Sequence, residues 1–210
     1  MMSKIRVSEE HDGQTLNSSV AKAVACAARV DGAEIDVAVF AADCAGLAST
    51  AAELDGVSRV LTVERAENES TLAALLATQI VAMADDYTHL FGPSTTYGKD
   101  LMPRVAALLG VNQVSDIMEV VSSRQFKRPI YAGNAVVTVE APADTHVVAT
   151  ARIASYTAVG GGTSATVESV ALDVELPSHT RLVDLKSGSS DRPDLQTAPK
   201  VVSGGRALAS

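Results

Sequence analysis

The sequence is poor in aromatic residues and in cysteine. Aromatic residues make up 3% of its 210 positions, tryptophan is absent, and there are two cysteines. Alanine and valine must therefore supply most of the core, which requires close packing of small side chains. Cys26 and Cys44 form no CxxC motif and have no neighbouring histidine. The sequence predicts two reduced, buried cysteines in a cytosolic protein rather than a disulfide or a metal site.

Excess basic charge and long apolar runs are also missing. The formal net charge is −8, and no basic stripe offsets it locally, so we expect no nucleic-acid partner. No apolar run approaches the ~20 residues of a membrane span. Residues 1–6 resemble neither a signal peptide nor a transit peptide, so we expect a cytoplasmic location. An apolar content of 47% and a charged content of 20% exclude wholesale disorder.

The first 121 residues alternate between strand-like and helix-like segments. Strand-like segments cover residues 4–8, 35–41, 57–63, 87–91 and 114–121. Helical spacing of apolar residues covers residues 15–30, 70–84 and 98–109. This alternation predicts an α/β fold with a mostly parallel sheet and helices on both faces.

After about residue 122 no helix intervenes between the strand-like segments. These are residues 126–131, 135–140, 146–153 and 167–175. We expect antiparallel hairpins that extend or flank the sheet. The glycine-rich segment 160–164 is interpreted as a flexible connector rather than a phosphate cradle.

The last 25 residues change in composition. Residues 186–199 are rich in Ser, Gly, Asp and Pro, which is typical of a linker. Residues 200–210 suggest an apolar strand entering a Gly-Gly turn. We therefore predict an N-terminal α/β domain over 1–185, a linker over 186–199, and in 200–210 the first part of another domain.

Residues 92–100, Gly-Pro-Ser-Thr-Thr-Tyr-Gly-Lys-Asp, lie between a predicted strand and a predicted helix. Hydroxyls and free N–H groups at a helix N-terminus suit an anion. The spacing is not that of a Walker A loop, and Asp100 stands where a Mg²⁺-binding hydroxyl is needed. The simpler interpretation is that Ser94, Thr95 or Thr96 caps the helix and that nothing binds.

Other candidate residues give weaker signals. Arg104, within the third predicted helix, has Asp116 as a possible ion-pair partner, although a solvated helix face explains it equally well. Tyr131 and Asn134 flank a turn in which Gly133 and Asn134 suit positive φ; hairpin chemistry alone accounts for both. None of the four histidines has a Cys, His or carboxylate partner at the spacing of a metal site or a catalytic triad, so we interpret each as structural or on the surface. They are His11, His89, His146 and His179. The sequence contains no combination of a nucleophile and a base that would indicate an enzyme.

Five segments together carry a family resemblance. Residues 10–17, 92–109, 115–117 and 128–135, followed by the closing Val-Val-Ser-Gly-Gly-Arg at 201–206, appear in the order found in the alpha subunit of electron transfer flavoprotein. The sequence resembles that family over nearly its whole length. Two segments depart from the usual pattern. Residues 151–156, Ala-Arg-Ile-Ala-Ser-Tyr, stand where the family usually has Val-Arg, a Thr-rich turn and Phe, and Ala207 stands where it usually has glycine.

The resemblance implies an adenine-nucleotide-hydrolase-like fold and a subunit of an electron carrier rather than a catalyst. The family is a heterodimer of alpha and beta subunits with one FAD. It carries electrons from dehydrogenases, typically acyl-CoA dehydrogenases of fatty acid β-oxidation, to a membrane-bound quinone reductase or a related acceptor. Of the family's FAD contacts only Arg206 maps onto this sequence, so we expect no FAD binding by residues 1–210 alone. The alternative is a stand-alone module that binds an adenine nucleotide through residues 94–99.

Overall fold

The computed structural model describes residues 3–184, 198 and 200–205. A seven-stranded parallel sheet forms its centre, with the strand order β10-β3-β2-β1-β4-β9-β5. The strands in this order are β10 (Thr166–Ser169), β3 (Val57–Glu64), β2 (Ala33–Ala41), β1 (Ser3–Ser8), β4 (His89–Pro93), β9 (Val147–Ala151) and β5 (Gln113–Ile117). The α/β fold with a mostly parallel sheet is confirmed.

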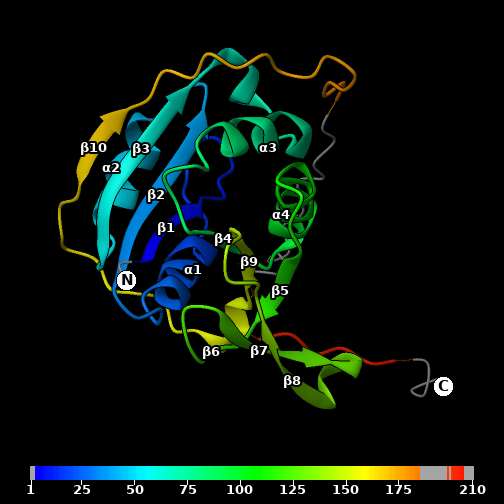
Figure 1. Cartoon of the computed structure of the whole chain (residues 1–210). Helices are drawn as coiled ribbons and strands as arrows, with labels where there is room; N and C mark the ends of the chain where they lie inside the picture. The colour runs from blue at the N-terminus through cyan, green and yellow to red at the C-terminus, as the bar shows by residue number, and fades with distance from the viewer. Residues whose placement is uncertain (1–2, 185–197, 199, 206–210) are drawn as a thin grey trace.

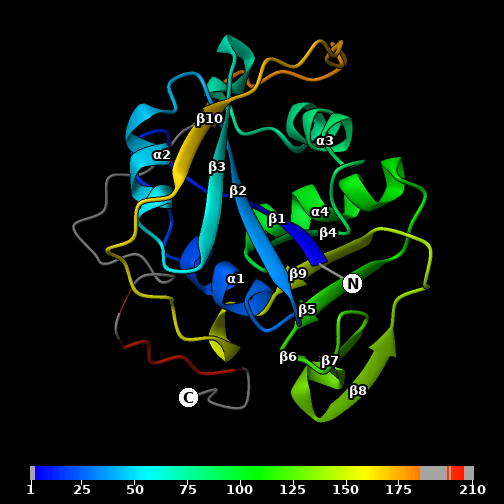
Figure 2. The same cartoon turned by 60° about the vertical axis from the view of Figure 1, so that its left-hand side comes forward.

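Helices cover both faces of this sheet (Figures 1 and 2). Helices α1 (Ser19–Ala27) and α2 (Ala45–Ala52) pack on one face. Helices α3 (Ala73–Ala82) and α4 (Thr96–Leu108) pack on the other. The interior is built largely from valine and alanine, as the scarcity of aromatic residues predicts. Within the described residues, none of the helices combines the length and apolar character that crossing a bilayer requires.

A small antiparallel sheet, which we call the β6–β8 sheet, lies beside the main one (Figure 2). It consists of β6 (Glu119–Val120), β7 (Gln125–Ile130) and β8 (Ala135–Glu140). The β7–β8 pair is the predicted hairpin. Phe126 is fully buried and lies edge-on to Phe91 of β4, with ring centroids 6.3 Å apart, so it links the small sheet to the main core.

The predicted hairpin character of two later segments is wrong. Strand β9 inserts between β4 and β5 and runs parallel to both. Strand β10 pairs in parallel with β3 at the opposite edge. Both strands therefore complete the main sheet, because their neighbours in space come from distant parts of the sequence.

Local boundaries differ from the prediction at three places. Helix α2 was not predicted. Helix α1 begins at Ser19 rather than at residue 15, because Asn17 Oδ1 accepts the Ser19 N–H (2.9 Å) and His11 bridges Leu16 in the preceding loop. The predicted strand 114–121 divides into β5 and β6, since Asp116 has a left-handed φ of 61°.

The glycine-rich segment 160–164 does more than connect two strands. Gly161 forms an antiparallel bridge with Leu54, and the Asp55 N–H donates to the Gly160 carbonyl (3.0 Å). The Gly162 N–H donates to the Glu53 carbonyl (2.9 Å). These bonds fix the approach to β10 against the end of α2.

Candidate functional site at the strand switch point

The sheet reverses its winding between β1 and β4. Strand order proceeds from β1 to β2 and β3 on one side and from β4 to β9 on the other. In open α/β sheets, ligands bind beyond the carboxyl ends of the strands at such a switch point. We therefore treat the residues that follow β1 and β4 as the candidate site, and call Ser8–His11, Ser19 and Ser94–Tyr97 the switch-point site.

Thr95 caps α4 at this site. Its Oγ1 accepts the Gly98 N–H (3.2 Å) and donates to Glu10 Oε2 (2.8 Å). The Ser19 hydroxyl at the start of α1 donates to the same carboxylate oxygen (2.9 Å). The cap interpretation of residues 94–96 is thus confirmed, with Thr95 as the cap. The Glu10 carboxylate lies where the N-terminus of a helix favours negative charge.

Glu9 precedes Glu10 in the chain and is 1% exposed. Its Oε1 accepts the Phe40 N–H at the end of β2 (2.9 Å), while Oε2 is buried and has no hydrogen-bond partner among the described residues. Burial raises the pKa of Glu9 to about 8, and the neighbouring Glu10 acts in the same direction. The Glu9 carboxyl is therefore largely protonated at pH 7.

His11 forms a second side-chain hydrogen bond to β2. Its Nδ1 accepts the Gly13 N–H (2.8 Å), so the ring proton resides on Nε2, which donates to the Phe40 carbonyl (3.1 Å). Glu9 Oε1 lies 3.6 Å from the same Nε2. Glu9 and His11 together bind both polar groups of Phe40 and hold the β1–α1 loop to β2.

This arrangement opposes a bound nucleotide. Phosphates bind at helix N-termini through free N–H groups and positive charge. Here the hydroxyls of Thr95, which caps α4, and of Ser19 already donate to the Glu10 carboxylate. A phosphate would meet that charge directly, so the geometry weighs against the stand-alone nucleotide module.

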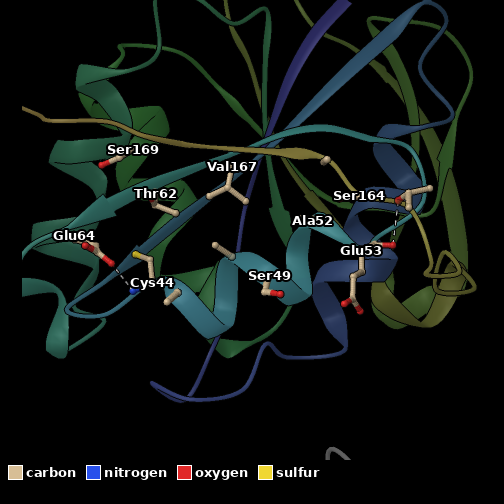
Figure 3. Close-up of a pocket in the computed structure, with 13 residues that line it drawn as sticks. Cys44, Ser49, Ala52, Glu53, Thr62, Glu64, Ser164, Val167 and Ser169 are labelled. Atoms are coloured by element: carbon tan, nitrogen blue, oxygen red, sulfur yellow. Dashed lines mark hydrogen bonds between the residues drawn. The ribbon is translucent and has the colours of Figure 1, made fainter.

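A cavity of about 540 Å³ lies elsewhere, between α2, β3 and β10 (Figure 3). Small and hydroxyl side chains line most of it, with Glu53 and Glu64 at its margins. Glu64 Oε1 accepts the Cys44 N–H at the start of α2 (2.9 Å). With its two carboxylates, this cavity is poorly suited to phosphates.

Both cysteines are buried and free, as predicted. Burial raises the pKa of Cys26 to about 12 and that of Cys44, which borders the cavity, to about 11. Since the thiolate is the reactive form, neither is a nucleophile near neutral pH.

The predicted partnership of Arg104 and Asp116 is wrong. Asp116 Oδ2, within β5, lies 3.8 Å from the Nε of Arg152, the residue that follows β9. Arg104 is half-buried on α4, and its buried Nε has no hydrogen-bond partner among the described residues.

The turn between β7 and β8 differs from the prediction in its backbone. Gly133 has the expected positive φ (91°), whereas Asn134 is right-handed (φ −72°). Tyr131 and Ala132 take left-handed values instead, 50° and 52°. Asn134 Nδ2 donates to the Tyr131 carbonyl (2.9 Å), and the Tyr131 side chain is 80% exposed.

Two of the histidines, for which the sequence favours structural or surface roles, contact backbone carbonyl groups. His89 Nε2 contacts the Ser123 carbonyl (2.6 Å), and burial lowers the pKa of its ring. His146 contacts the Tyr87 carbonyl. In the part of the chain that the structure describes, no three His, Cys, Asp or Glu residues are placed to hold a metal ion. Arg206 and the linker residues 186–197 and 199 lie outside the described residues.

Sequence reasoning missed the chemistry of Glu9, Glu10 and Ser19. One signal was available, because two adjacent acids follow the first strand directly. The carboxyl end of a strand in an α/β sheet is where functional side chains gather. What the sequence did not show is that the α4 cap, 85 positions away, bonds to Glu10.

Comparison with known proteins places the chain in a family. Residues 5–175 match the family model described as "Electron transfer flavoprotein domain". Electron transfer flavoprotein subunit alpha of Pseudomonas aeruginosa is 42% identical over 205 residues, which is 97% of this chain and 65% of the relative. The Paracoccus denitrificans subunit alpha is 39% identical over 209 residues, 100% of this chain and 67% of the relative. The mitochondrial subunit alpha of Dictyostelium discoideum is 34% identical over 95% of this chain and 60% of the relative.

The chain thus spans about two thirds of the length of the curated relatives it matches. Both the family model and these relatives cover most of its residues, including the switch-point site and the β6–β8 sheet. The chain therefore belongs to the electron transfer flavoprotein family.

Proposed function

We propose that this chain forms part of the alpha subunit of an electron transfer flavoprotein. In the heterodimer with a beta subunit, it supports transfer of electrons from dehydrogenases, such as acyl-CoA dehydrogenases, to a quinone reductase or a related respiratory acceptor. The observation that carries the proposal is the 42% identity to a subunit alpha over 97% of the chain. The role is that of an electron carrier in the cytoplasm rather than of a catalyst.

FAD, when bound, would supply the redox chemistry of such a carrier. Two features of the described residues argue against its being held among them. At the switch-point site the Glu10 carboxylate already accepts the Thr95 hydroxyl, and the cavity between α2, β3 and β10 has Glu53 and Glu64 at its margins. We propose that FAD is held by Arg206 and by residues beyond the α/β domain, with domain 1–185, linker 186–199 and the start of a second domain at 200–210.

We further propose that the beta subunit covers the region of residues 126–175, and above all the β6–β8 sheet. Three large apolar side chains of this sheet and its turns are exposed: Tyr131 at 80%, Val136 at 51% and Val121 at 46%. Residues 119–140 carry three basic and two acidic side chains, so this sheet departs from the acidity of the whole chain. An exposed, weakly charged surface with an aromatic side chain is typical of a protein interface.

The test is capture of a purified beta subunit by this chain. Deleting residues 126–175 is too severe, because it removes β9 from the centre of the main sheet. The double variant Tyr131→Ser, Val136→Ser changes only exposed side chains, and we expect it to lose capture while its melting temperature is retained. Val167→Ser, which alters a 48% exposed side chain on β10, is the matched control. Unchanged capture by the double variant would contradict the assigned surface, and no capture by the unaltered chain would contradict pairing through this domain.

A further inference from the structure

His89 lies on β4 where the main sheet meets the β6–β8 sheet. It is 2% exposed, and its ring lies edge-on to Phe91, with ring centroids 5.8 Å apart. Phe91 in turn contacts Phe126 of β7. His89 Nε2 lies 2.6 Å from the carbonyl oxygen of Ser123, in the turn between β6 and β7. One imidazole ring therefore joins β4 to the turn from which the β7–β8 hairpin begins.

The hydrogen bonds of the ring show where its protons lie. A carbonyl oxygen only accepts, so Nε2 carries a proton in every state of the ring. Nδ1 lies 2.7 Å from Thr88 Oγ1, which is also 3.0 Å from the Lys4 carbonyl of β1. When the ring is neutral, the Thr88 hydroxyl donates to Nδ1, and the Lys4 carbonyl still accepts the Thr88 N–H (2.9 Å). When the ring is charged, Nδ1 donates to Oγ1, and the hydroxyl proton turns to Lys4. Both states satisfy these hydrogen bonds, so they differ in charge alone.

The surroundings of His89 oppose a positive charge on the ring. Both ring nitrogens face uncharged oxygens, so no carboxylate is bonded to the ring. Burial lowers the pKa of His89 below its usual value, and the guanidinium of Arg124, in the same turn, also lowers it. Asp31, after α1, has the opposite sign and lines the same cavity of about 270 Å³. It is exposed, so water and salt screen its charge.

The other elements packed around the ring bring it no further charge. Strands β1 and β9 place Ile5 and Val147 beside His89. Three more titratable groups lie on these elements or next to them. They are Lys4, whose ammonium lies over the ring of Tyr87, His146, whose ring contacts a backbone carbonyl, and Cys26 of α1, whose pKa burial raises to about 12.

We propose that His89 is an acid-sensitive latch between the two sheets, which holds the β6–β7 turn against β4 while the ring is neutral and releases it on protonation. Above about pH 6.5 the ring is neutral whether the turn is closed or open. Below that pH the ring of the open form, which is in water, takes up a proton first. Falling pH therefore favours the open turn by up to about tenfold per pH unit. The inference does not depend on a beta subunit, because every group of the latch belongs to this chain.

Amide hydrogen exchange of the 210-residue chain at pH 7.5 and 5.5 tests the latch, with each rate divided by its intrinsic value at that pH. The reporters are the N–H groups of Met118, Val121 and Ala141, whose acceptors lie in the turn or on β7. We expect them to exchange up to about tenfold faster at pH 5.5, relative to the amides of β2. Nitrogen NMR of the His89 ring should show the neutral Nε2–H form at pH 7.5 and a titration midpoint below 6.5.

His89→Gln separates the latch from other effects of acid, because its side-chain amide can donate to the Ser123 carbonyl but does not titrate. We expect its turn to remain closed at both pH values. His146→Asn is the matched control, since it removes another histidine bonded to a backbone carbonyl and should keep the acid response. Acid opening that persists in His89→Gln would overturn the proposal.

If His89→Gln does not fold, the NMR titration of the unaltered chain gives the decision. Opening of the turn that follows the titration of the His89 ring would support the latch. A ring that is already charged at pH 7.5, or a turn that stays closed after the ring has become charged, would overturn it.

Discussion

The switch-point site and the β6–β8 sheet differ in where their side chains find partners. At the switch point, Glu10 and Thr95 bond to each other, and Glu9 and His11 bond to the backbone of β2. In the β6–β8 sheet, Tyr131 and Val136 extend into solvent. In the first region the polar groups are bonded within this chain, whereas in the second large apolar side chains are exposed. The place of a residue in an α/β fold therefore does not by itself decide its function. Here the strand switch point, where such folds usually bind ligands, is the region whose polar groups are bonded within the chain.

Glu9→Gln gives the largest expected effect on the free energy of unfolding. It tests whether the Glu9 carboxyl at the switch point is shielded from solvent. The pKa of Glu9 is raised from 4.5 to about 8 on folding. Below pH 4.5 the carboxyl is protonated in both the folded and the unfolded chain. Between pH 4.5 and 8 the unfolded chain releases the proton first, so the free energy of unfolding falls as pH rises. The full loss is at most roughly 5 kcal/mol.

The Gln variant cannot ionise and should retain that stability. We expect it to be more stable than the unaltered chain at pH 9 and close to it at pH 4.5, as measured by urea denaturation at both pH values. Parallel pH profiles for the two proteins would show that Glu9 is solvated and the site open.

Phe126→Ala tests the other side of the comparison, namely the attachment of the β6–β8 sheet. Phe126 is fully buried against Phe91, so its removal should cost about 3–5 kcal/mol in the free energy of unfolding. Val136→Ala, in the same sheet but 51% exposed, should change it by less than about 0.5 kcal/mol. Equal effects of the two substitutions would mean that the small sheet is not anchored through Phe126.

Thr95→Ala tests the α4 cap. The variant loses the acceptor for the Gly98 N–H and one donor to Glu10, which should cost about 1–2 kcal/mol. The neighbouring Thr96→Ala changes an exposed residue inside the helix and serves as the control. A larger loss for Thr96→Ala in chemical denaturation would disprove the assignment of the cap.

Ala132→Gly gives the smallest expected effect and concerns the exposed turn. Ala132 has a φ of 52°, which glycine adopts without a Cβ penalty. The substitution relieves about 1 kcal/mol of backbone strain in the folded state, but glycine also increases the conformational entropy of the unfolded chain. The net effect should be a rise of about 0.5 kcal/mol in the free energy of unfolding. A clear destabilisation would show that the left-handed turn is not strained.

Local pattern predicted much of this fold. Strands β1 to β4 and helices α1, α3 and α4 appear near their expected places because apolar periodicity determines which face of each element is buried. Helix α2 was not predicted, because most residues of Ala45–Ala52 are small and similar in polarity. The sequence therefore shows little difference between an apolar and a polar face of this helix. The orientation of β9 was wrong because pairing between β4 and β5 is a long-range property.

The candidate site was harder to predict for the same reason. The Thr95 cap follows from local sequence, since a hydroxyl preceding a helix is a frequent cap. The Glu10–Thr95 bond joins loops after two strands that only the fold makes neighbours. Likewise, the left-handed φ of Tyr131 and Ala132, neither of which is glycine, has no local signal.

The central claim is that this domain contributes to a flavoprotein without binding the cofactor through its own switch point. Calorimetric titration of the 210-residue chain with FAD and with AMP tests it most directly. The account predicts no saturable heat with either ligand, because the anion position is filled by Glu10. One-to-one binding of either at micromolar concentration, or a purified yellow chain with a flavin absorption band, would contradict it.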